Sequence, residues 1–172
     1  MNSPSFRDIM YNNPKYRIDW REISIHDDNN IKGFFSEFRF LSNFEPVKIE
    51  FEGRIYPSTE NAYQAAKIMD FQRDYFVSCS SSNAKSKWKT FIPKYSAAKW
   101  DEIKLDIMEK VSIEKYKNPE LKQKLLGTGD KYLEESNFWQ DVFWGVDYKL
   151  GGRNELGKLL MKIREGIKNE KI

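Results

Sequence analysis

The chain has 172 residues, of which 40% are hydrophobic and 15% aromatic, a composition typical of a globular protein with a substantial core rather than a disordered one. Its 29 basic and 26 acidic residues give a net charge of +3, which argues against nucleic-acid binding through bulk charge alone. One cysteine excludes an internal disulfide, and no apolar stretch reaches the roughly 20 residues of a membrane helix. We therefore predict a cytoplasmic protein without membrane contacts.

The inventory of reactive side chains narrows the chemistry further. His26 is the only histidine, and it lies in the polar stretch IHDDNN, which we interpret as a loop. A Ser-His-Asp triad, a Cys-His pair or a His-built metal site would depend on this one residue. If the protein is an enzyme, its working groups are therefore carboxylates, amides, lysine, tyrosine or tryptophan. We expect no metal and no cofactor.

The first predicted elements are strands. Residues 1–30 are mixed and polar, and we predict an N-terminal extension that precedes one domain over residues 31–172. That domain opens with a short strand in IKGFF and a hairpin over residues 47–56, which turns at Gly53.

Beyond the hairpin the sequence pattern is helical. We predict helices within YPSTENAYQAAK after an N-cap at Ser58, in FQRDYFVS, in SNAKSKWKTF, over residues 97–116, in PELKQKLL, and over residues 154–168. This order of elements predicts an α+β, predominantly helical single domain with a short N-terminal hairpin or small sheet.

The first of these helices carries a set of candidate site residues. Because an α-helix advances about 100° per residue, Glu60, Gln64 and Lys67 fall within roughly 60° of one another. Tyr63 borders this stripe, and we expect Phe71 to continue it one turn on. The stripe is either a solvated face or the wall of a site, and the aromatic neighbours favour the wall.

A second set lies in FRFLSNFEP, residues 38–46, which is rich in phenylalanine. Its aromatic side chains, with Phe35 shortly before them, either fill the core or stack on a flat ligand. Ser42 and Asn43 either form a turn or donate hydrogen bonds to the polar edge of a ligand.

A third set lies near the C-terminus. Trp144 can stack on a base or a sugar, and Asp141 can stabilise an oxocarbenium-like centre beside it. The loop LGGRN enters a helix and offers backbone N–H groups and Arg153 to a phosphate. The alternative is structural, with glycines that form the turn and Asn154 as an N-cap.

The three sets, in this order and spacing, resemble the NADAR family, which is also called YbiA-like. The resemblance spans roughly Phe34 to Arg164, about three quarters of the chain. The matching segments are FLSNF, YPSTENAYQAAK, WDEIKLDIM, LLGTGD with LEE, DVFWG, and GGRNELGKLLMKIRE.

This resemblance implies N-glycosidase chemistry in a compact, mainly helical α+β domain without a metal. Some members cleave ribosylamine-type intermediates of riboflavin synthesis, and others remove ADP-ribose from guanine bases in nucleic acid, which reverses DarT-type toxins. We expect removal of ADP-ribose from guanine, with an ADP-ribose-type nucleotide substrate on DNA or RNA. The alternatives are the riboflavin-type activity and a non-catalytic module that binds NAD or ADP-ribose.

Carried over by matching position, the family's polar signature falls on Ser58, Glu60, Gln64, Lys67, Asp141, Trp144, Gly145, Asn154 and Gly157. Two positions depart from the pattern. Some relatives have histidine at the position of Asn61, and some have aspartate at the position of Val146. These departures argue against a simple transfer of the riboflavin-type substrate.

Glu60, Lys67 and Asp141 are the candidate catalytic residues. The two carboxylates would share the work at the anomeric carbon and at the water or the base, in an order that the sequence leaves open. Lys67 either attacks C1 as a neutral amine and forms an imine, or pairs with Glu60. The candidate substrate-binding residues are Phe35, Ser42, Asn43, Ser58, Tyr63, Gln64, Trp144, Gly145, Arg153 and Asn154. We expect the early helix to meet Asp141 and Trp144 around a sugar.

Overall fold

The structure is a computed structural model of the chain, and it describes residues 20–171. These residues form two compact units, each made from two segments of the sequence. Unit 1 contains the described residues up to Phe38 together with Asp130–Met161. Unit 2 contains Arg39–Gly129 and the residues from Lys162 onward. Most of the predicted N-terminal extension, residues 1–19, lies outside the described residues.

Unit 1 is built on short strands. Its elements are η2 (Trp20–Glu22, a 3₁₀ helix), β1 (Ile25–His26), β2 (Asn30–Lys32), β5 (Tyr132–Glu134), β6 (Ser136–Asn137), β7 (Val146–Asp147) and the first half of α7 (Glu155–Lys168). The strands β1, β2 and β5 form a three-stranded sheet, in which β1–β2 is antiparallel and β2–β5 is parallel. A parallel pair, β6–β7, follows. The predicted small sheet is therefore present, and it includes strands from both ends of the chain.

The loop predicted around His26 is wrong at that residue. His26 is the last residue of β1, where it pairs with Ile31 of β2. The turn lies just after it, because the Asp27 carboxylate accepts hydrogen bonds from the backbone N–H groups of Asn29 and Asn30. A strand of only two residues next to a polar turn shows no alternating pattern, so the sequence did not predict it.

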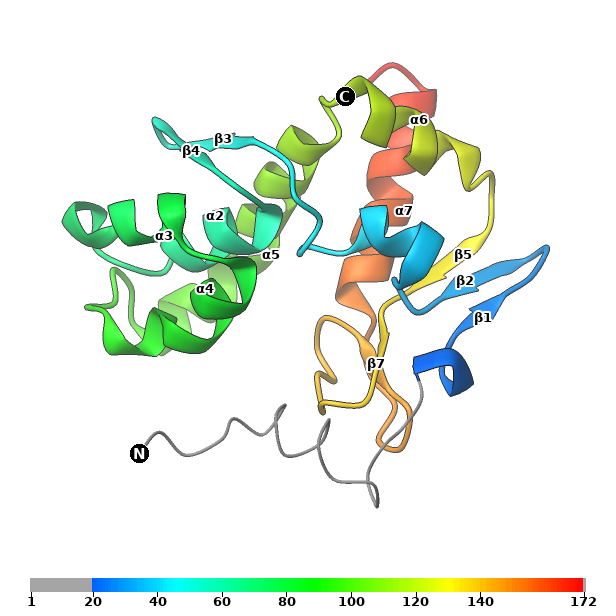
Figure 1. The fold of residues 1–172 in the computed structure, drawn as a ribbon, viewed down its shortest axis with the longest axis horizontal. Coiled ribbons are helices and arrows are strands. Elements are labelled where there is room, and N and C mark those ends of the chain that lie inside the picture. Colours follow the sequence, from blue (N-terminus) through cyan, green and yellow to red (C-terminus); the bar gives the residue numbers. More distant parts are fainter. Residues whose placement is uncertain (1–19, 172) are drawn as a thin grey trace. The chain divides into compact units, whose positions relative to one another are not determined.

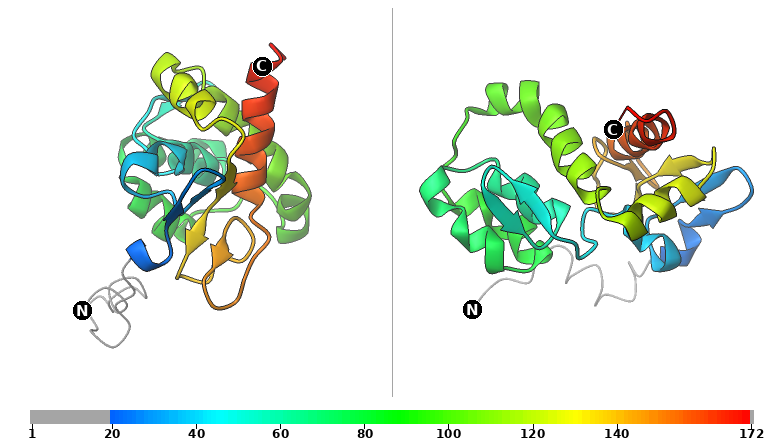
Figure 2. Two further views of the ribbon diagram at one scale, coloured as in Figure 1. Left: turned by 90° about the vertical axis from the view of Figure 1, so that its right-hand side faces the viewer. Right: turned by 90° about the horizontal axis from the view of Figure 1, so that it is seen from above.

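The sheet of unit 1 holds its core through β2, β5 and α7. Ile31 and Leu133 face each other in the central strand pair and are buried. The first turns of α7 run beside β5 (Figure 2), and a Cβ at Gly157 would lie 2.1 Å from the carbonyl oxygen of Leu133. Glycine at this position therefore allows the helix to approach the strand closely.

Gly145 is required by a similar close approach. A Cβ there would lie 2.3 Å from the carbonyl oxygen of Glu135 and 2.7 Å from the side-chain nitrogen of Asn137. We expect Gly145→Ala to lower the free energy of unfolding by about 3 kcal/mol, because backbone must shift to make room. The expected fall in Tm is roughly 6–12 °C in thermal unfolding followed by circular dichroism.

Gly127→Ala is the matched control for that substitution. Gly127 lies in a helix, and nothing lies within 4 Å of the Cβ that it would gain. Its Tm should stay the same or rise slightly. Equal effects of the two substitutions would contradict the packing argument.

Unit 2 holds the helices that surround the first candidate set (Figure 1). Its elements are η3 (Ser36–Leu41, which begins in unit 1), β3 (Ile49–Phe51), β4 (Arg54–Tyr56), α2 (Thr59–Ala65), η4 (Asp70–Gln72), α3 (Asp74–Ser78), α4 (Ser81–Lys87), η5 (Trp88–Thr90), α5 (Ala97–Lys115), α6 (Pro119–Gly127) and the second half of α7. The predicted hairpin is confirmed: β3 and β4 are antiparallel, and Gly53 has a positive φ of 77°. The α+β, mainly helical fold class is confirmed as well.

The helix α2 is buried over its whole length. It contacts α3, α4, α5 and the β3–β4 hairpin, and all seven of its residues are buried. Ser58 is its N-cap, as predicted, and the Ser58 hydroxyl accepts a hydrogen bond from the backbone N–H of Asn61. Asn61 in turn donates to the carbonyl oxygens of Phe76 and Cys79, which ties α2 to α3. So short a helix is stable because of these contacts rather than its own propensity.

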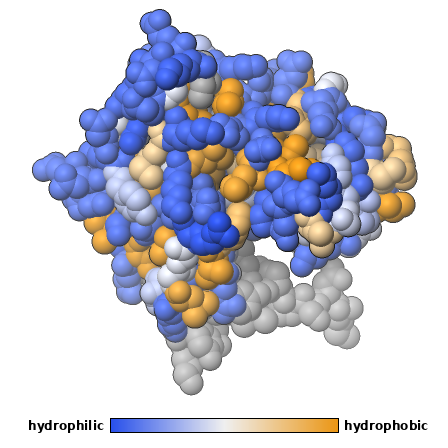
Figure 3. Space-filling view, turned by 180° about the vertical axis from the view of Figure 1, so that it is seen from behind, coloured by the Kyte–Doolittle hydropathy of each residue, from blue (hydrophilic) through white to orange (hydrophobic). Residues whose placement is uncertain are grey.

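Within residues 20–171, no helix has both the length and the apolar character that a membrane crossing demands. Most of the face drawn in Figure 3 is covered by hydrophilic residues, with separate hydrophobic areas among them.

Candidate functional site

The polar stripe of the first set is not a solvated face. Glu60 is only 5% exposed and Gln64 only 4% exposed, and both point into the interior of unit 2. The prediction that Phe71 continues the stripe is wrong. The helix α2 ends at Ala65, the chain then turns, and Phe71 is 68% exposed in η4. Burial of a carboxylate and an amide side by side requires polar partners for both, and it excludes the solvated face. That the stripe forms the wall of a site stays a prediction.

Lys67 lies just after α2 and is surrounded by aromatic rings. Its Nζ lies 4.2 Å from the ring centroid of Trp88, 4.8 Å from that of Tyr63 and 5.4 Å from that of Trp100. These are cation–π distances. The rings of Tyr63 and Trp100 also contact each other, with centroids 5.2 Å apart. We call Tyr63, Trp88 and Trp100 the aromatic cage.

The alternative in which Lys67 pairs with Glu60 is not observed. Among residues 20–171, no carboxylate lies within the 4.0 Å of an ion pair from the Lys67 ammonium, and none accepts a hydrogen bond from it. The pKa of Lys67 is lowered to about 8, first by burial and then by the nearby charges of Lys85, Lys89 and Lys104. Glu60 opposes this shift at a distance. Roughly a tenth of a lysine with that pKa is a neutral amine at pH 7.

The lowered pKa predicts a distinct pH dependence. If the neutral amine of Lys67 is the reactive form, kcat/KM should rise with pH and reach a plateau above about pH 8, because the charged form cannot attack. The measurement is a pH–rate profile on whichever glycosidic substrate the protein consumes. A profile that is flat between about pH 7 and pH 9 would contradict this role.

Glu60 and Gln64 form one polar unit. The Gln64 side-chain nitrogen donates to a carboxylate oxygen of Glu60 at 2.8 Å. The other polar atom of Gln64, its Oε1, is buried without a hydrogen-bond partner among the described residues. An unsatisfied buried acceptor costs about 1–3 kcal/mol, so a ligand donor that reached this oxygen would recover that energy.

The Ser42–Asn43 turn is attached to the same helix. The carbonyl oxygen of Asn43 accepts the backbone N–H of Glu60 at 2.9 Å. The hydroxyl of Ser42 accepts the N–H of Phe44, and its carbonyl accepts the buried ammonium of Lys115 at 2.8 Å. Ser42 is therefore a turn former, as one of its two interpretations predicted. The Asn43 side chain is buried and donates to the sulfur of Met108 at 3.5 Å.

Asp141 and Trp144 of the third set lie in unit 1 and are joined to each other locally. One carboxylate oxygen of Asp141 accepts the backbone N–H of Trp144 at 2.9 Å and that of Phe143 at 3.3 Å. The half-buried Trp144 packs edge-on against Phe143, with centroids 4.9 Å apart. The Asp141 carboxylate therefore stabilises the turn that contains Trp144.

The LGGRN loop does not offer the row of backbone donors that we predicted. The N–H of Gly151 bonds to Asp147, that of Arg153 to Val142, and that of Asn154 to Gly145. Donors that already bind carbonyl oxygens cannot also hold a phosphate, so these three N–H groups are not available for one. The Arg153 guanidinium lies 4.8 Å from the ring centroid of Phe143 and pairs with Glu155. A phosphate contact through its exposed side chain stays a prediction.

Asn154 fastens the start of α7 to β5. Its side-chain oxygen accepts the N–H of Glu135, and its side-chain nitrogen donates to the carbonyl of Leu133 at 2.9 Å. Because both polar atoms of this side chain bond to residues 132–135, it holds the strand, and the N-cap hydrogen bond that the alternative assumed is not observed. Phe35, also in unit 1, is half-buried.

The structure therefore gathers two groups of candidate residues. Unit 2 brings Glu60, Tyr63, Gln64 and Lys67 together with the Ser42–Asn43 turn and the N-cap Ser58. Unit 1 holds the others: Phe35, Asp141, Trp144, Gly145, Arg153 and Asn154. That the two groups meet around one sugar stays a prediction.

Sequence reasoning missed Trp88 and Trp100 as members of the site. The signal was weak, because Trp100 fits the apolar face of a long helix and Trp88 follows a lysine-rich helix. Only the turn after α2 brings Lys67 between these rings.

Comparison with known proteins gives the family. The profile of the NADAR domain matches residues 25–168. The chain is 35% identical over 130 residues to a riboflavin biosynthesis protein of Vibrio vulnificus, of which it spans only 35%. It is 31% identical to an N-glycosidase of Nostoc punctiforme, with 75% of this chain and 85% of that protein covered.

Escherichia coli N-glycosidase YbiA is 30% identical over 148 residues, with 83% of this chain and 92% of that protein covered. The NMR structure of E. coli YbiA matches with a TM-score of 0.73 and 28% identity, and covers 88% of this chain and 92% of that chain. The profile match includes all the candidate residues, the relatives cover most of the chain, and the chain therefore belongs to the NADAR family.

Proposed function

We propose that this protein hydrolyses a ribosyl C1–N glycosidic bond and removes ADP-ribose from modified guanine bases in DNA or RNA. Relatives named N-glycosidases support a hydrolase of glycosidic C–N bonds. The observation that carries the proposal is Lys67: a lysine with a pKa of about 8 lies in an aromatic cage, and no carboxylate in residues 20–171 pairs with it. A structural lysine would be paired or exposed.

The reaction we propose proceeds through an imine. The neutral Nζ of Lys67 attacks C1 of the ribose, and its two protons pass to the ring oxygen and to the departing nitrogen of the base. The C1–N bond breaks, the sugar ring opens, and an imine joins Nζ to C1. Water then adds to C1 and returns the amine. One water is consumed, and no oxidant or reductant is needed.

Glu60 and Gln64 would serve this reaction from the adjoining turns of α2. The carboxylate of Glu60 moves protons between the amine, the ring oxygen and the base, and stabilises positive charge at C1. Gln64 holds that carboxylate with its side-chain nitrogen and accepts a hydrogen bond from the substrate through Oε1. The rings of the aromatic cage exclude water from the amine and stack on the base or the sugar.

A lysine-rich stretch favours a nucleic-acid substrate over a free metabolite. Between Tyr75 and Trp100 the chain contains five lysines and no acidic residue, and this stretch includes one ring of the cage. The second candidate function is the N-glycosidase of riboflavin intermediates, which the similarity to the Vibrio protein favours. The departure at Asn61 does not decide between them, because its side chain ties α2 to α3.

The deciding experiment compares two substrates. The protein is incubated with DNA that carries ADP-ribosylated guanine and, in parallel, with a phosphorylated ribosylaminopyrimidine, and products are followed by mass spectrometry. Release of ADP-ribose from the DNA supports the proposal. Consumption of the pyrimidine alone would support the second candidate function instead. If the protein acts on neither substrate, a non-catalytic binding role replaces the proposal.

A further inference from the structure

A separate pocket of about 340 Å³ lies within unit 2, next to α2. Its walls are Arg39, Phe44, Pro46, Pro57 and the segment 79–82, which contains three serines. Its size lies within the range of about 300–1,000 Å³ that is usual for small-molecule sites. None of the candidate residues discussed above lines it.

The pocket is built from the neighbours of the candidate catalytic residues. Pro57 directly precedes the N-cap Ser58, and the hydroxyls of Ser58 and Ser81 are 2.9 Å apart. Phe44 directly follows Asn43, whose carbonyl oxygen accepts the N–H of Glu60. Two of the residues that line the pocket are therefore direct sequence neighbours of Ser58 and Asn43, which position the helix that carries Glu60.

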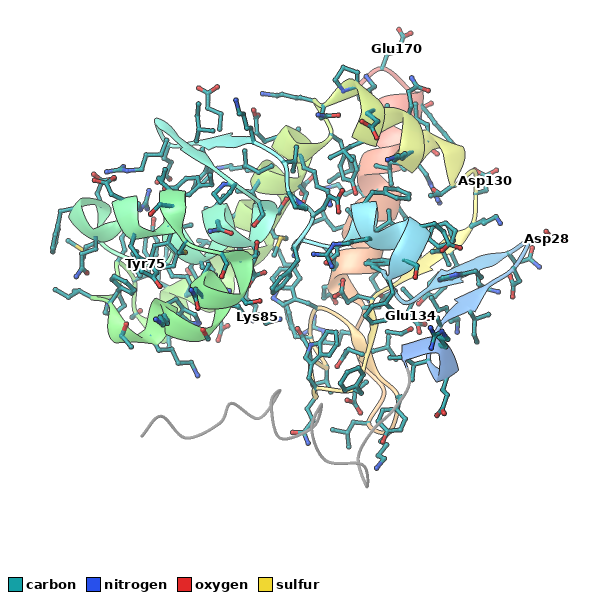
Figure 4. The ribbon with its side chains drawn as sticks, in the orientation of Figure 1. Asp28, Tyr75, Lys85, Asp130, Glu134 and Glu170 are labelled. Carbon is teal, nitrogen blue, oxygen red and sulfur yellow. The ribbon has the colours of Figure 1, made fainter. Side chains whose placement is uncertain are left out.

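Its walls combine flat apolar surfaces with one cationic side chain, Arg39, and a second cation, Lys85, lies near the Phe44 wall. The ring of Phe44 and the two prolines form the apolar part. The ammonium of Lys85, which extends from α4 (Figure 4), lies 5.5 Å from the ring centroid of Phe44. The guanidinium of Arg39 lies 3.7 Å from the carboxylate of Glu45 and donates to the carbonyl oxygen of Phe44 at 3.4 Å.

We propose that this pocket takes a nucleotide that adjoins the modified base on a nucleic-acid strand. Its base would stack on Phe44 between the prolines, and its phosphate would contact Arg39 and Lys85. Base stacking on an aromatic side chain tolerates any sequence, and cations beside it follow the phosphodiester backbone. The inference rests on the proposed function for its biological meaning, but the binding itself needs no modified base.

The test is therefore made with unmodified nucleic acid. Binding of a short fluorescein-labelled single-stranded DNA to the full chain is followed by fluorescence anisotropy at several salt concentrations. Phe44→Ala should weaken binding about 10-fold, which is the loss of one stacked base. Lys85→Glu should weaken it at low salt and lower the salt slope by about one or two, because it removes a cation and adds an anion.

Lys124→Glu is the matched control, since it makes the same charge change on α6 at an exposed position. It should change the affinity less than twofold at moderate salt. Lys85 is also exposed, so the Lys85 variant keeps the test decisive even if Phe44→Ala impairs folding.

Calorimetry with free ADP-ribose separates this pocket from the site at Lys67. Phe44→Ala should bind ADP-ribose as the unchanged protein does, whereas Lys85 acts on the charge of Lys67 and is tested with DNA alone. Three results would overturn the proposal: the unchanged protein does not bind the DNA, Lys85→Glu and Lys124→Glu lose DNA affinity equally, or Phe44→Ala loses as much affinity for ADP-ribose as for DNA. Failure of the proposed function is distinct, because an inert protein could still show the expected DNA binding.

Discussion

Replacing Lys67 with methionine should lower turnover by on the order of 10³-fold or more, because the proposed nucleophile is lost while the apolar stem is kept. Borohydride added during turnover should trap a covalent adduct of protein and sugar, seen by intact mass, and Lys67→Met should abolish it. Lys124→Met, at an exposed position on α6, is the control and should keep both turnover and the adduct. An adduct that persists in Lys67→Met would end the imine mechanism.

The same substitution should make the protein more stable. The pKa of Lys67 falls from 10.5 to about 8 on folding, so the unfolded state binds its proton more tightly. This penalty corresponds to roughly 3 kcal/mol, at 1.36 kcal/mol per pH unit. It is present in full below about pH 8 and disappears as the pH rises toward 10.5. Urea unfolding should therefore show the greatest gain for Lys67→Met near neutral pH and a smaller gain at alkaline pH.

A more stable but inactive variant would distinguish a functional lysine from a structural one. Removing a lysine that stabilises the fold lowers the free energy of unfolding. Removing a lysine whose charged form is buried at a cost, for the sake of function, raises it. A loss of stability at all pH values for Lys67→Met, with Lys124→Met unchanged, would contradict the buried-amine interpretation.

Glu60→Gln should lower kcat by about 10²–10⁴-fold and leave the fold intact, since the two side chains have the same shape. It also removes the negative charge that raises the pKa of Lys67. The residual activity should therefore reach its plateau at a lower pH than that of the unchanged protein, because the amine loses its proton more easily. A pH–rate profile of the variant measures this.

Glu50→Gln on β3 is the control for Glu60→Gln, because Glu50 is exposed and should leave both kcat and the pH profile unchanged. Calorimetry with ADP-ribose on the Glu60 variant tests the non-catalytic alternative. If the protein is a non-catalytic binding module, Glu60→Gln should keep its affinity for ADP-ribose, and neither the variant nor the unchanged protein should show turnover. Unchanged kcat in Glu60→Gln would exclude this carboxylate from the chemistry.

Local sequence was enough for most of the helices and for one hairpin. The N-cap at Ser58, the turn at Gly53 and the stop after α6 rest on backbone preferences that act within a few residues. The same local rules placed Glu60 and Gln64 on one side of a helix, whereas Lys67, which the periodicity put on the same stripe, lies in the turn just past the end of α2. Short-range geometry is readable because it needs no information about distant parts of the chain.

The strands β5, β6 and β7 were not predictable in this way. Each has two or three residues, and β5 is a strand because it pairs with β2, about a hundred residues earlier. So short a segment carries no periodicity, and its hydrogen bonds are decided by the tertiary fold.

The sequence by itself determined which chemistry is available: one histidine, one cysteine, and a stripe of acid, amide and amine that matches a known family. Only the tertiary structure decided that Glu60 and Gln64 are buried, that Lys67 lies among three aromatic rings, and that most N–H groups of the LGGRN loop already have partners. The reason is physical. Burial and pKa depend on which distant side chains replace water, and periodicity along the chain does not specify those neighbours.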